Sequence, residues 1–250
     1  MIRVEADGDV GVLLLDRAAK RNALTPEMLG ALPERAREAA AGRRALVLAG
    51  EGPVFCAGFD LKMCAGDALG QTMRDLLSGL GASVAALRGL EVPIVIAAHG
   101  AAVAGGAALL GGGDVVVVDA DAKIGYPVVK IGVSPAVSAA FLIHSVFAGG
   151  VRERLLDPEL IDGRAAHRIG MAHEVVDRPE DVRPRALELA HRLAFKPGRA
   201  ASATRAWLHE IEIGMTALGA EAPTRGLAAS LSIAGNDDER ARLGEMWGGR

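Results

Sequence analysis

The sequence predicts an α/β fold in which a layered core of strands and helices is followed by a helical C-terminal region. Up to about residue 135, short apolar runs bounded by turn residues alternate with stretches of helical spacing, which is typical of layered α/β cores. From Ala136 onward the spacing is almost wholly helical. The chain has 250 residues, of which 50% are hydrophobic, so it can bury one large core.

The first predicted elements are a hairpin and a helix. Ile2–Val4 and Val10–Leu15 are separated by Asp7-Gly8-Asp9, and Asp-Gly supplies the positive φ that a tight turn needs. Thr25-Pro26-Glu27 starts a helix, because Thr is a good N-cap and Pro suits the first helical position. Apolar residues then follow at helical spacing at Met28, Leu29, Leu32 and Ala36.

Later elements follow from similar signals. Buried strands are predicted at Ala45–Ala49, Pro93–Ala97 and Asp114–Asp119. Helices are predicted at Ala136–Phe147, Gly163–Ile169, Asp181–Leu193, Arg199–Ile213 and Asp237–Trp247. We place an α/β core at residues 1–195 and a C-terminal helical region at residues 196–250.

Composition excludes several classes of protein. The net charge of -3 and the pI of about 6.1 give no support for nucleic-acid binding. Cys56 and Cys64 have neither zinc-ligand nor disulfide-framework spacing, so we expect no metal site and a reduced, cytoplasmic setting. The N-terminus carries acids where a signal peptide would be apolar, and Pro93, His99 and glycines interrupt the most apolar stretch. We expect no membrane partner.

Two glycine-centred turns carry most of the functional information. The first is Phe55-Cys56-Ala57-Gly58-Phe59-Asp60-Leu61, and the second runs from His99 to Ala108 with Gly100, Gly105 and Gly106. Each follows a strand-like run and leads toward a helix-like one, so each can present backbone N–H groups to a polarised carbonyl oxygen. The alternative is that these glycines only permit tight packing.

In this order and spacing, the two turns resemble the crotonase superfamily, in which enoyl-CoA hydratases and isomerases bind acyl-CoA thioesters. The resemblance implies a ββα superhelical core and C-terminal helices that assemble a homotrimer or a dimer of trimers. It implies that the N–H groups of Phe59 and Gly105 form an oxyanion hole. It also implies no permanently bound cofactor, because coenzyme A arrives as part of the substrate.

A basic segment is the second point of resemblance. Lys20-Arg21-Asn22-Ala23-Leu24 is similar to the family segment whose backbone holds the CoA adenine and whose basic side chains face its phosphates. Lys62 matches a position that is often basic in relatives, and Asp60 matches one that holds the turn through hydrogen bonds. The resemblance implies that the substrate contacts Lys20, Arg21, Ala23, Ala57, Asp60, Leu61 and Lys62. On charge alone, a solvated basic cluster is the alternative.

Both hydratase acids are expected to be missing. In the resemblance, one glutamate position falls on Ala108 and the other on Val128, within Ile124-Gly125-Tyr126-Pro127-Val128. A hydratase uses two carboxylates to activate water and protonate carbon, and each such group contributes about 10²- to 10⁴-fold. We therefore expect Ala108 and Val128 to make the substrate site apolar, and hydration to be very slow.

Other polar residues have weaker signals. Tyr126 could present its hydroxyl to the acyl site, with ring packing as the alternative. His99 is expected to be a satisfied core histidine and His144 a helix-packing or interface histidine, with a catalytic base as the alternative. Ser134 and Ser138 are expected to be caps or surface groups, and Cys56 a small buried thiol.

Three hypotheses about function remain open. The first is an enzyme that uses the oxyanion hole for decarboxylation, carbon–carbon cleavage, thioester hydrolysis or an unusual isomerisation. The second is a non-catalytic acyl-CoA-binding protein, a carrier or sensor. The third is an unrelated α/β domain with chance glycine motifs.

Overall fold

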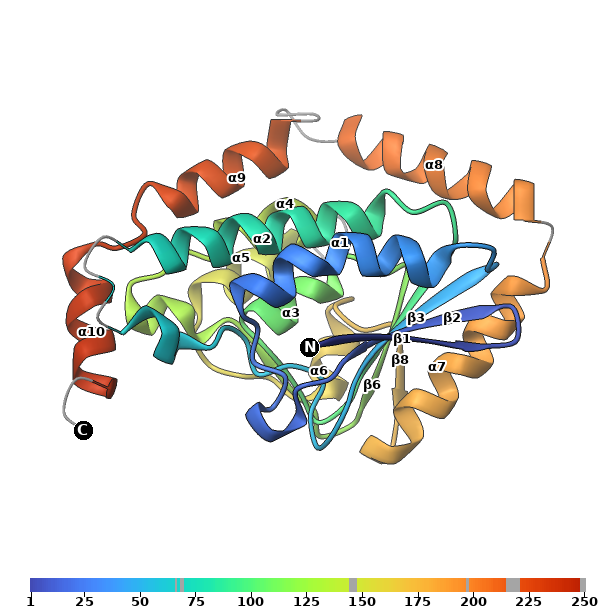
Figure 1. The fold of residues 1–250 in the computed structure, drawn as a ribbon, viewed down its shortest axis with the longest axis horizontal. Coiled ribbons are helices and arrows are strands. Elements are labelled where there is room, and N and C mark those ends of the chain that lie inside the picture. The colour runs from blue at the N-terminus through green and yellow to red at the C-terminus, as the bar shows by residue number, and fades with distance from the viewer. Residues whose placement is uncertain (66, 68–69, 144–147, 197, 215–220, 248–250) are drawn as a thin grey trace.

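Strands of the described residues form two sheets (Figure 1). The computed structural model describes residues 1–65, 67, 70–143, 148–196, 198–214 and 221–247. The larger sheet has the order β1-β2-β3-β4-β6-β8 and consists of Ile2–Asp7, Val10–Leu15, Ala45–Gly50, Ile94–Ala98, Val115–Asp119 and Glu174–Val176. The smaller sheet pairs β5 (Ala101–Val103) with β7 (Lys123–Gly125).

The predicted hairpin and the three predicted strands are confirmed. β1 and β2 are antiparallel, and Gly8 in their turn has a φ of +57°. The other pairs of the larger sheet are parallel. The helix predicted after Thr25 is α1 (Pro26–Ala40), and Thr25 accepts a hydrogen bond from the Met28 N–H at 3.1 Å.

The chain winds through repeated units of long strand, short strand and helix. β4 is followed by the short strand β5 and then by α3 (Gly105–Leu110), and β6 is followed by β7 and then by α4 (Ala136–Leu142). β3 leads to Cys56, which bridges to Ala102 of β5, and then to α2 (Gln71–Arg88). The second and third units contribute β5 and β7 to the smaller sheet, and the first adds the single bridge at Cys56, so the three turns that follow lie in neighbouring positions.

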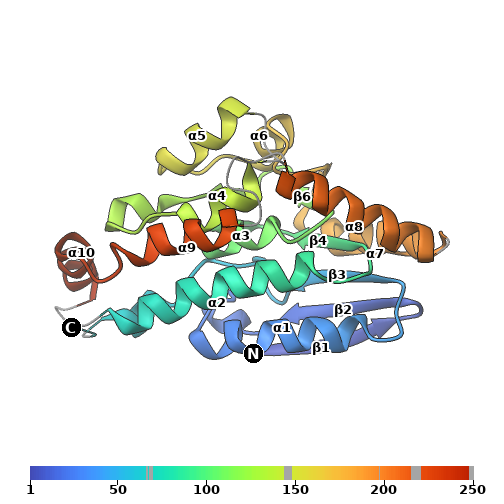
Figure 2. The same cartoon turned by 90° about the horizontal axis from the view of Figure 1, so that it is seen from above.

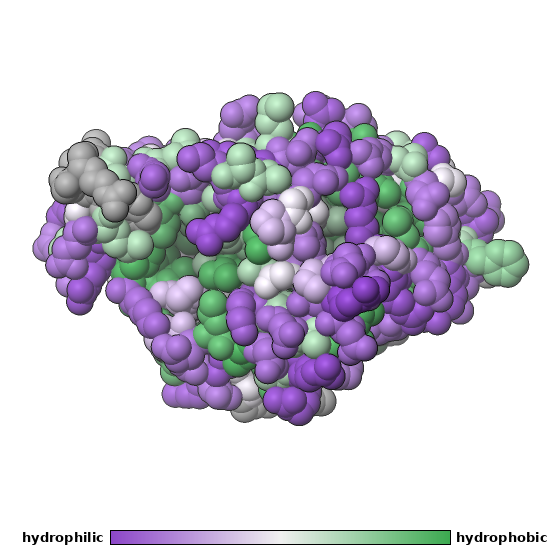
Figure 3. Space-filling view, turned by 90° about the horizontal axis from the view of Figure 1, so that it is seen from below, coloured by the Kyte–Doolittle hydropathy of each residue, from purple (hydrophilic) through white to green (hydrophobic). Residues whose placement is uncertain are grey.

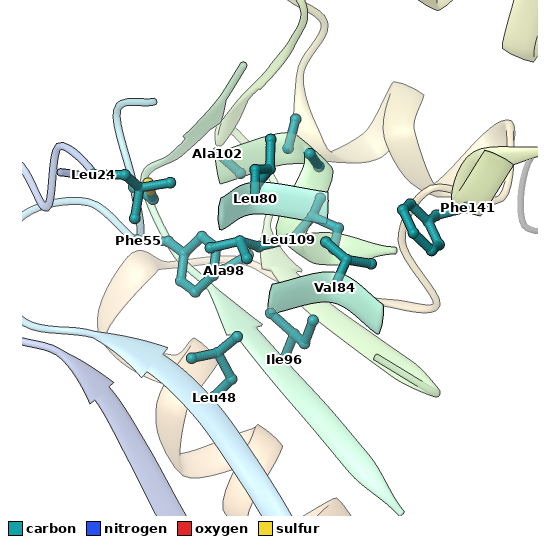
Figure 4. Packing of buried hydrophobic residues seen from close by; sticks show 14 of the residues in the cluster. Leu24, Leu48, Phe55, Leu80, Val84, Ile96, Ala98, Ala102, Leu109 and Phe141 are labelled. Atoms are coloured by element: carbon teal, nitrogen blue, oxygen red, sulfur yellow. The ribbon is translucent and has the colours of Figure 1, made fainter. Parts of the chain in front are cut away.

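The central strands of the larger sheet, β2, β3, β4 and β6, are buried on both faces, as expected of parallel strands covered by helices. α1 and α2 lie side by side over one face, and α7 (Pro179–Ala194) lies over the other (Figure 2). Successive side chains of β4 point to opposite faces of the sheet. Ile94, Ile96 and Ala98 therefore face α2 and α3, whereas Val95 and Ala97 face α7. Figure 4 shows Ile96 and Ala98 packed with Val84 and Leu109.

The C-terminal region is helical. The predictions at Gly163–Ile169, Asp181–Leu193, Arg199–Ile213 and Asp237–Trp247 are confirmed as α6 (Gly163–Arg168), α7, α8 (Gly198–Gly214) and α10 (Asp237–Trp247). The helix predicted at 136–147 begins as α4, but residues 144–147, including His144, lie outside the described residues. Sequence reasoning did not single out α5 (Ala148–Leu156), α9 (Ala222–Leu231) or the 3₁₀ helices η1 (Ala18–Lys20), η2 (Leu61–Cys64) and η3 (Pro127–Ile131).

The described helices include none that could span a membrane, because none combines the length and the apolar composition that such a crossing requires.

Candidate active site

Four segments lie side by side at the ends of the short strands. The loop at 21–24 bonds to the first glycine turn: Leu24 N donates to Gly58 O at 2.7 Å, and Asp60 N donates to Leu24 O at 2.8 Å. That turn bonds in turn to β5, where Val103 N donates to Cys56 O at 3.0 Å. β5 joins the end of β7, because Ala104 N donates to Gly125 O at 2.8 Å. Backbone hydrogen bonds therefore hold all the predicted site segments in one row.

Glycine is required where the first two turns meet. Gly58 has a φ of +95°, which residues with a side chain rarely adopt. A Cβ on Gly106 would lie 2.5 Å from Cys56 O, and a Cβ on Gly105 would lie 2.9 Å from Cε1 of the Phe59 ring. The two turns can approach this closely only because these positions carry no side chain.

The Phe59 and Gly105 N–H groups are available as donors. Phe59 forms a parallel bridge with Leu24 in which the bonds run through Gly58 O and Asp60 N, so its own N–H points away from Leu24. Gly105 is the first residue of α3, and the first N–H groups of a helix have no partner within that helix. Among the described residues, neither N–H donates a backbone hydrogen bond in a turn, loop or helix cap.

Ala104, immediately before Gly105, has a strained backbone. Its φ is +52° and its ψ is −111°, a conformation that costs an L-residue about 1–3 kcal/mol. Ala104 N is held by Gly125 O, and Ala104 O accepts the Ala108 N–H at 2.9 Å. Such strain persists only where the surrounding structure holds the backbone in place. Here the hydrogen bonds of Ala104 hold it at the start of α3.

A cavity of about 460 Å³ lies beside these turns. Its wall is mainly apolar, and Figure 3 shows exposed hydrophobic surface on this underside of the molecule near the α10 end. Its lining residues are Ala57, Phe59, Leu61, Met73, Val103, Ala104, Pro127, Val128, Lys130, Ile131, Val133, Arg242, Glu245 and Met246. The size and apolar wall suit a small organic ligand with a hydrocarbon part.

Several predicted site residues are brought together here. Ala57, Phe59, Leu61 and Val128 line the cavity. Ala108 is buried in α3, one helical turn after Ala104. The Phe59 ring lies so close to Gly105 that a Cβ at position 105 would not fit.

The predicted CoA-binding residues lie next to the first turn. Ala23 is half-buried, whereas the side chains of Lys20, Arg21 and Lys62 are exposed to solvent. Arg21 O accepts a hydrogen bond from Ala57 N at 3.0 Å, which ties this segment to the turn. A second cavity, of about 690 Å³, lies nearby and includes Arg17, Arg35 and Met63 in its wall.

Tyr126 is packed in the core and does not line the cavity. Its side chain is 1% exposed, and among the described residues its hydroxyl has no hydrogen-bond partner. Burial raises the pKa of Tyr126 well above its ordinary value, and the nearby Ser138 hydroxyl opposes the rise only in part, without the geometry of a hydrogen bond. The ring therefore fills space here, and proton transfer by Tyr126 stays a prediction.

Cys56 is a buried thiol, as predicted. It is fully buried, its Sγ–H donates to Asn22 O at 3.3 Å, and burial raises the pKa of Cys56 to about 12. A thiol with such a pKa supplies almost no thiolate near neutral pH, which argues against a nucleophile at this position.

The prediction that His99 is a core histidine is wrong. The residue is half-exposed because β4 ends at Ala98, and its ring Nε2 lies 2.8 Å from Gly52 O. Ser134 lies one residue before Pro135, the N-cap of α4, and its Oγ accepts the Ala136 N–H at 3.3 Å. Ser138 is buried rather than on the surface.

Two groups of site residues have no clear signal in the sequence. Arg17 pairs with Asp60 at 2.8 Å although a whole helix and strand separate them along the chain. Arg242, Glu245 and Met246 reach the cavity from α10, which is held next to η3 by Asn236 Nδ2 donating to Gly132 O at 3.1 Å. An amphipathic helix near the C-terminus predicts burial of one face but not the surface against which it packs.

Known proteins share both the sequence and the fold. The sequence model of the Enoyl-CoA hydratase/isomerase family matches residues 5–217. A Thermus thermophilus protein provisionally named an enoyl-CoA hydratase is 31% identical over 237 residues, covering 88% of this chain and 87% of that protein. The 2,3-dehydroadipyl-CoA hydratase of Escherichia coli is 31% identical over 192 residues, covering 75% of this chain and 72% of that enzyme.

Solved structures agree with these relatives. An enoyl-CoA hydratase/isomerase from Xanthobacter autotrophicus has a TM-score of 0.85 at 27% identity, covering 99% of this chain and 93% of that one. An enoyl-CoA hydratase/isomerase from Mycobacterium paratuberculosis has a TM-score of 0.84 at 23% identity, covering 98% and 97%.

The superhelical α/β core, the row of glycine turns and these comparisons place the chain in the crotonase superfamily. Within that class, it belongs to the enoyl-CoA hydratase/isomerase family.

Proposed function

We propose that this protein binds an acyl-CoA thioester and stabilises an enolate or tetrahedral oxyanion with the N–H groups of Phe59 and Gly105. The observation that carries the proposal is the contact between the two glycine turns at the edge of an apolar cavity, where neither N–H group has a partner recorded among the described residues. Fixed donors at a developing negative charge are effective because they need no reorganisation, and one donor contributes about 3 kcal/mol to lowering the barrier.

The thioester would lie with its oxygen at Phe59 and Gly105 and its acyl chain in the 460 Å³ cavity. Ala23, Ala57 and the basic residues Lys20, Arg21 and Lys62 would bind the CoA portion. Because Lys20, Arg21 and Lys62 are exposed, their attraction to phosphates is screened and should weaken in salt. Coenzyme A is then part of the substrate rather than a resident cofactor.

We propose further that the hydratase reaction is very slow. Buried Ala108 and cavity-lining Val128, the positions that resemble the two hydratase glutamates, carry no group that can transfer a proton. Among the described residues that line the cavity, the titratable groups are Lys130, Arg242 and Glu245, and each lies outside the glycine turns. A reaction that needs no paired carboxylates, such as decarboxylation, carbon–carbon cleavage, thioester hydrolysis or an unusual isomerisation, suits the site better.

A non-catalytic acyl-CoA carrier or sensor is the second candidate. The apolar wall near the donors favours it, because binding needs the cavity and the donors but no acid or base. A panel of acyl-CoAs should be tested for binding by calorimetry and for conversion by mass spectrometry. Binding with conversion supports the enzyme, binding without conversion supports the carrier, and no binding to any acyl-CoA refutes both.

We propose a homotrimer, or a dimer of trimers, assembled through the region at 196–250. α8 exposes apolar side chains at Trp207, Leu208 and Ile211, which is unusual for a solvent-facing helix. Light scattering on the eluting protein should give three or six times the mass of one chain. A monomer would refute this proposal while leaving the CoA site untouched.

A further inference from the structure

Arg17 joins the proposed CoA-binding segment to the proposed oxyanion turn. It follows β2, and its guanidinium Nη2 lies 2.8 Å from Asp60 Oδ2. Its Nη1 donates to Ala23 O at 3.0 Å. Asp60 directly follows Phe59, so one side chain holds a residue from each segment.

Hydrogen bonds hold the backbone of Arg17 in place. Arg17 N donates to Asn22 Oδ1 at 2.8 Å, and the Asn22 amide donates to Glu51 O, Val54 O and Phe55 O at 2.8–3.0 Å. Asn22 is fully buried. Its hydrogen bonds tie the loop that carries Arg17 to the segment that leads into the first glycine turn.

The Arg17–Asp60 ion pair is partly shielded from solvent, so its electrostatic interaction is stronger than that of a surface pair. The two side chains are 27% and 15% exposed, so solvent screens the pair less than a surface ion pair. Without Arg17, the Asp60 carboxylate would stand uncompensated one residue from a donor that faces a forming negative charge. It would also be free to turn, and a charge of the same sign so close disfavours an oxyanion.

We propose that Arg17 is a positioning residue, which fixes and neutralises Asp60 so that the Phe59 N–H stays directed at the thioester oxygen while the CoA segment is occupied. This inference rests on the proposed acyl-CoA site. Two different contacts then have two different roles. The backbone hydrogen bonds of Leu24 hold the turn near the CoA segment, and the Arg17 side chain sets the charge and orientation at the turn.

The test measures polarisation of a bound thioester. Crotonyl-CoA with carbon-13 at the thioester carbonyl is bound to the full chain, and infrared difference spectra give the lowering of the C=O stretch for the bound fraction. Calorimetry gives Kd separately. The variants are Arg17→Met, which keeps bulk without charge, Arg17→Lys, and the control Arg178→Met, which breaks an Arg–Asp pair at the exposed start of α7.

Arg17→Met should lose at least half of the C=O shift, while its Kd rises by less than about tenfold, because a positioning residue affects the polarised state more than ground-state binding. Arg17→Lys should recover part of the shift, since it restores the charge but not the two-pronged geometry. Arg178→Met should behave as wild type. A merely structural role would lower affinity and stability without changing the shift of the bound fraction.

A full wild-type shift in Arg17→Met overturns the inference. If that variant does not fold, Arg17→Gln removes the same charge, leaves Asp60 uncompensated and must reduce the shift, or the inference is wrong. If the wild-type chain binds no acyl-CoA, or binds it without any shift, the proposed function itself fails. These failures are therefore distinguishable.

Discussion

The close contact between the two glycine turns predicts a large effect for Gly106→Ala. The added Cβ would lie 2.5 Å from Cys56 O and 2.8 Å from Cys56 Cβ. Neither atom can rotate away, because the first is backbone and the second is attached directly to it. Cys56 O must therefore retreat by about half an ångström or more, since non-bonded carbon contacts are optimal only at about 3.5–4.0 Å.

That retreat lengthens a buried hydrogen bond. Cys56 O accepts the Val103 N–H at 3.0 Å, and Cys56 is fully buried. Overpacking costs about 1–3 kcal/mol, and weakening a hydrogen bond costs about 0.5–1.5 kcal/mol. We expect the free energy of unfolding to fall by about 2–4 kcal/mol. The shift of the turn should also misdirect the proposed oxyanion donor at Phe59, and loss of such a donor costs on the order of 10²-fold in turnover.

Urea denaturation followed by circular dichroism measures the loss. The matched control is Gly30→Ala in α1, where a Cβ would meet no atom within 4 Å. There the same substitution should raise the free energy of unfolding by about 0.5–1 kcal/mol, because alanine favours a helix. The reasoning is refuted if Gly106→Ala is as stable as wild type and polarises a bound thioester equally well.

Four further predictions concern strain and burial. Ala104→Gly should raise the free energy of unfolding by about 1 kcal/mol, because glycine tolerates a φ of +52°; a destabilised variant in urea would contradict the strain. Tyr126→Phe should leave stability unchanged or raise it by about 1 kcal/mol, since the hydroxyl has no partner among the described residues. Because burial raises the Tyr126 pKa, wild type should also lose stability as pH rises above about 10, where the unfolded chain ionises, and the Phe variant should lose less in the same titration. Burial lowers the pKa of His173, whose Nδ1 accepts the Val116 N–H at 2.9 Å; wild type should lose stability as pH falls below about 6.5, and a His173→Asn variant with an equal loss would refute this cause.

Local signals explain why much of the fold could be predicted. Asp-Gly between two apolar runs gave the β1–β2 hairpin, and Thr-Pro gave the start of α1, because each signal acts within a few residues. The glycine turns could be found for the same reason: close approach at Gly106 demands a residue without a side chain. The short strands β5 and β7 were missed, since each has only three residues, which are too few to show strand periodicity.

The rest of the site depends on contacts between distant segments. Nothing near Arg17 in the sequence indicates that it pairs with Asp60, because the pair exists only once Leu24 bridges to Phe59. Likewise, α10 reaches the cavity through its contacts with η2 and η3, which are distant from it in the sequence. His99 was assigned to the core from the apolar strand before it, but β4 ends at Ala98, so His99 lies outside the strand and is half-exposed.

The most direct test follows a carbon-13-labelled crotonyl-CoA mixed with the wild-type protein by nuclear magnetic resonance. We expect the thioester carbonyl resonance to move on binding, because the proposed Phe59 and Gly105 N–H donors would hold its oxygen. We also expect no β-hydroxyacyl-CoA to accumulate, because Ala108 and Val128 supply no acid. Rapid formation of the β-hydroxyacyl-CoA, or binding that leaves the carbonyl resonance unchanged, would contradict it.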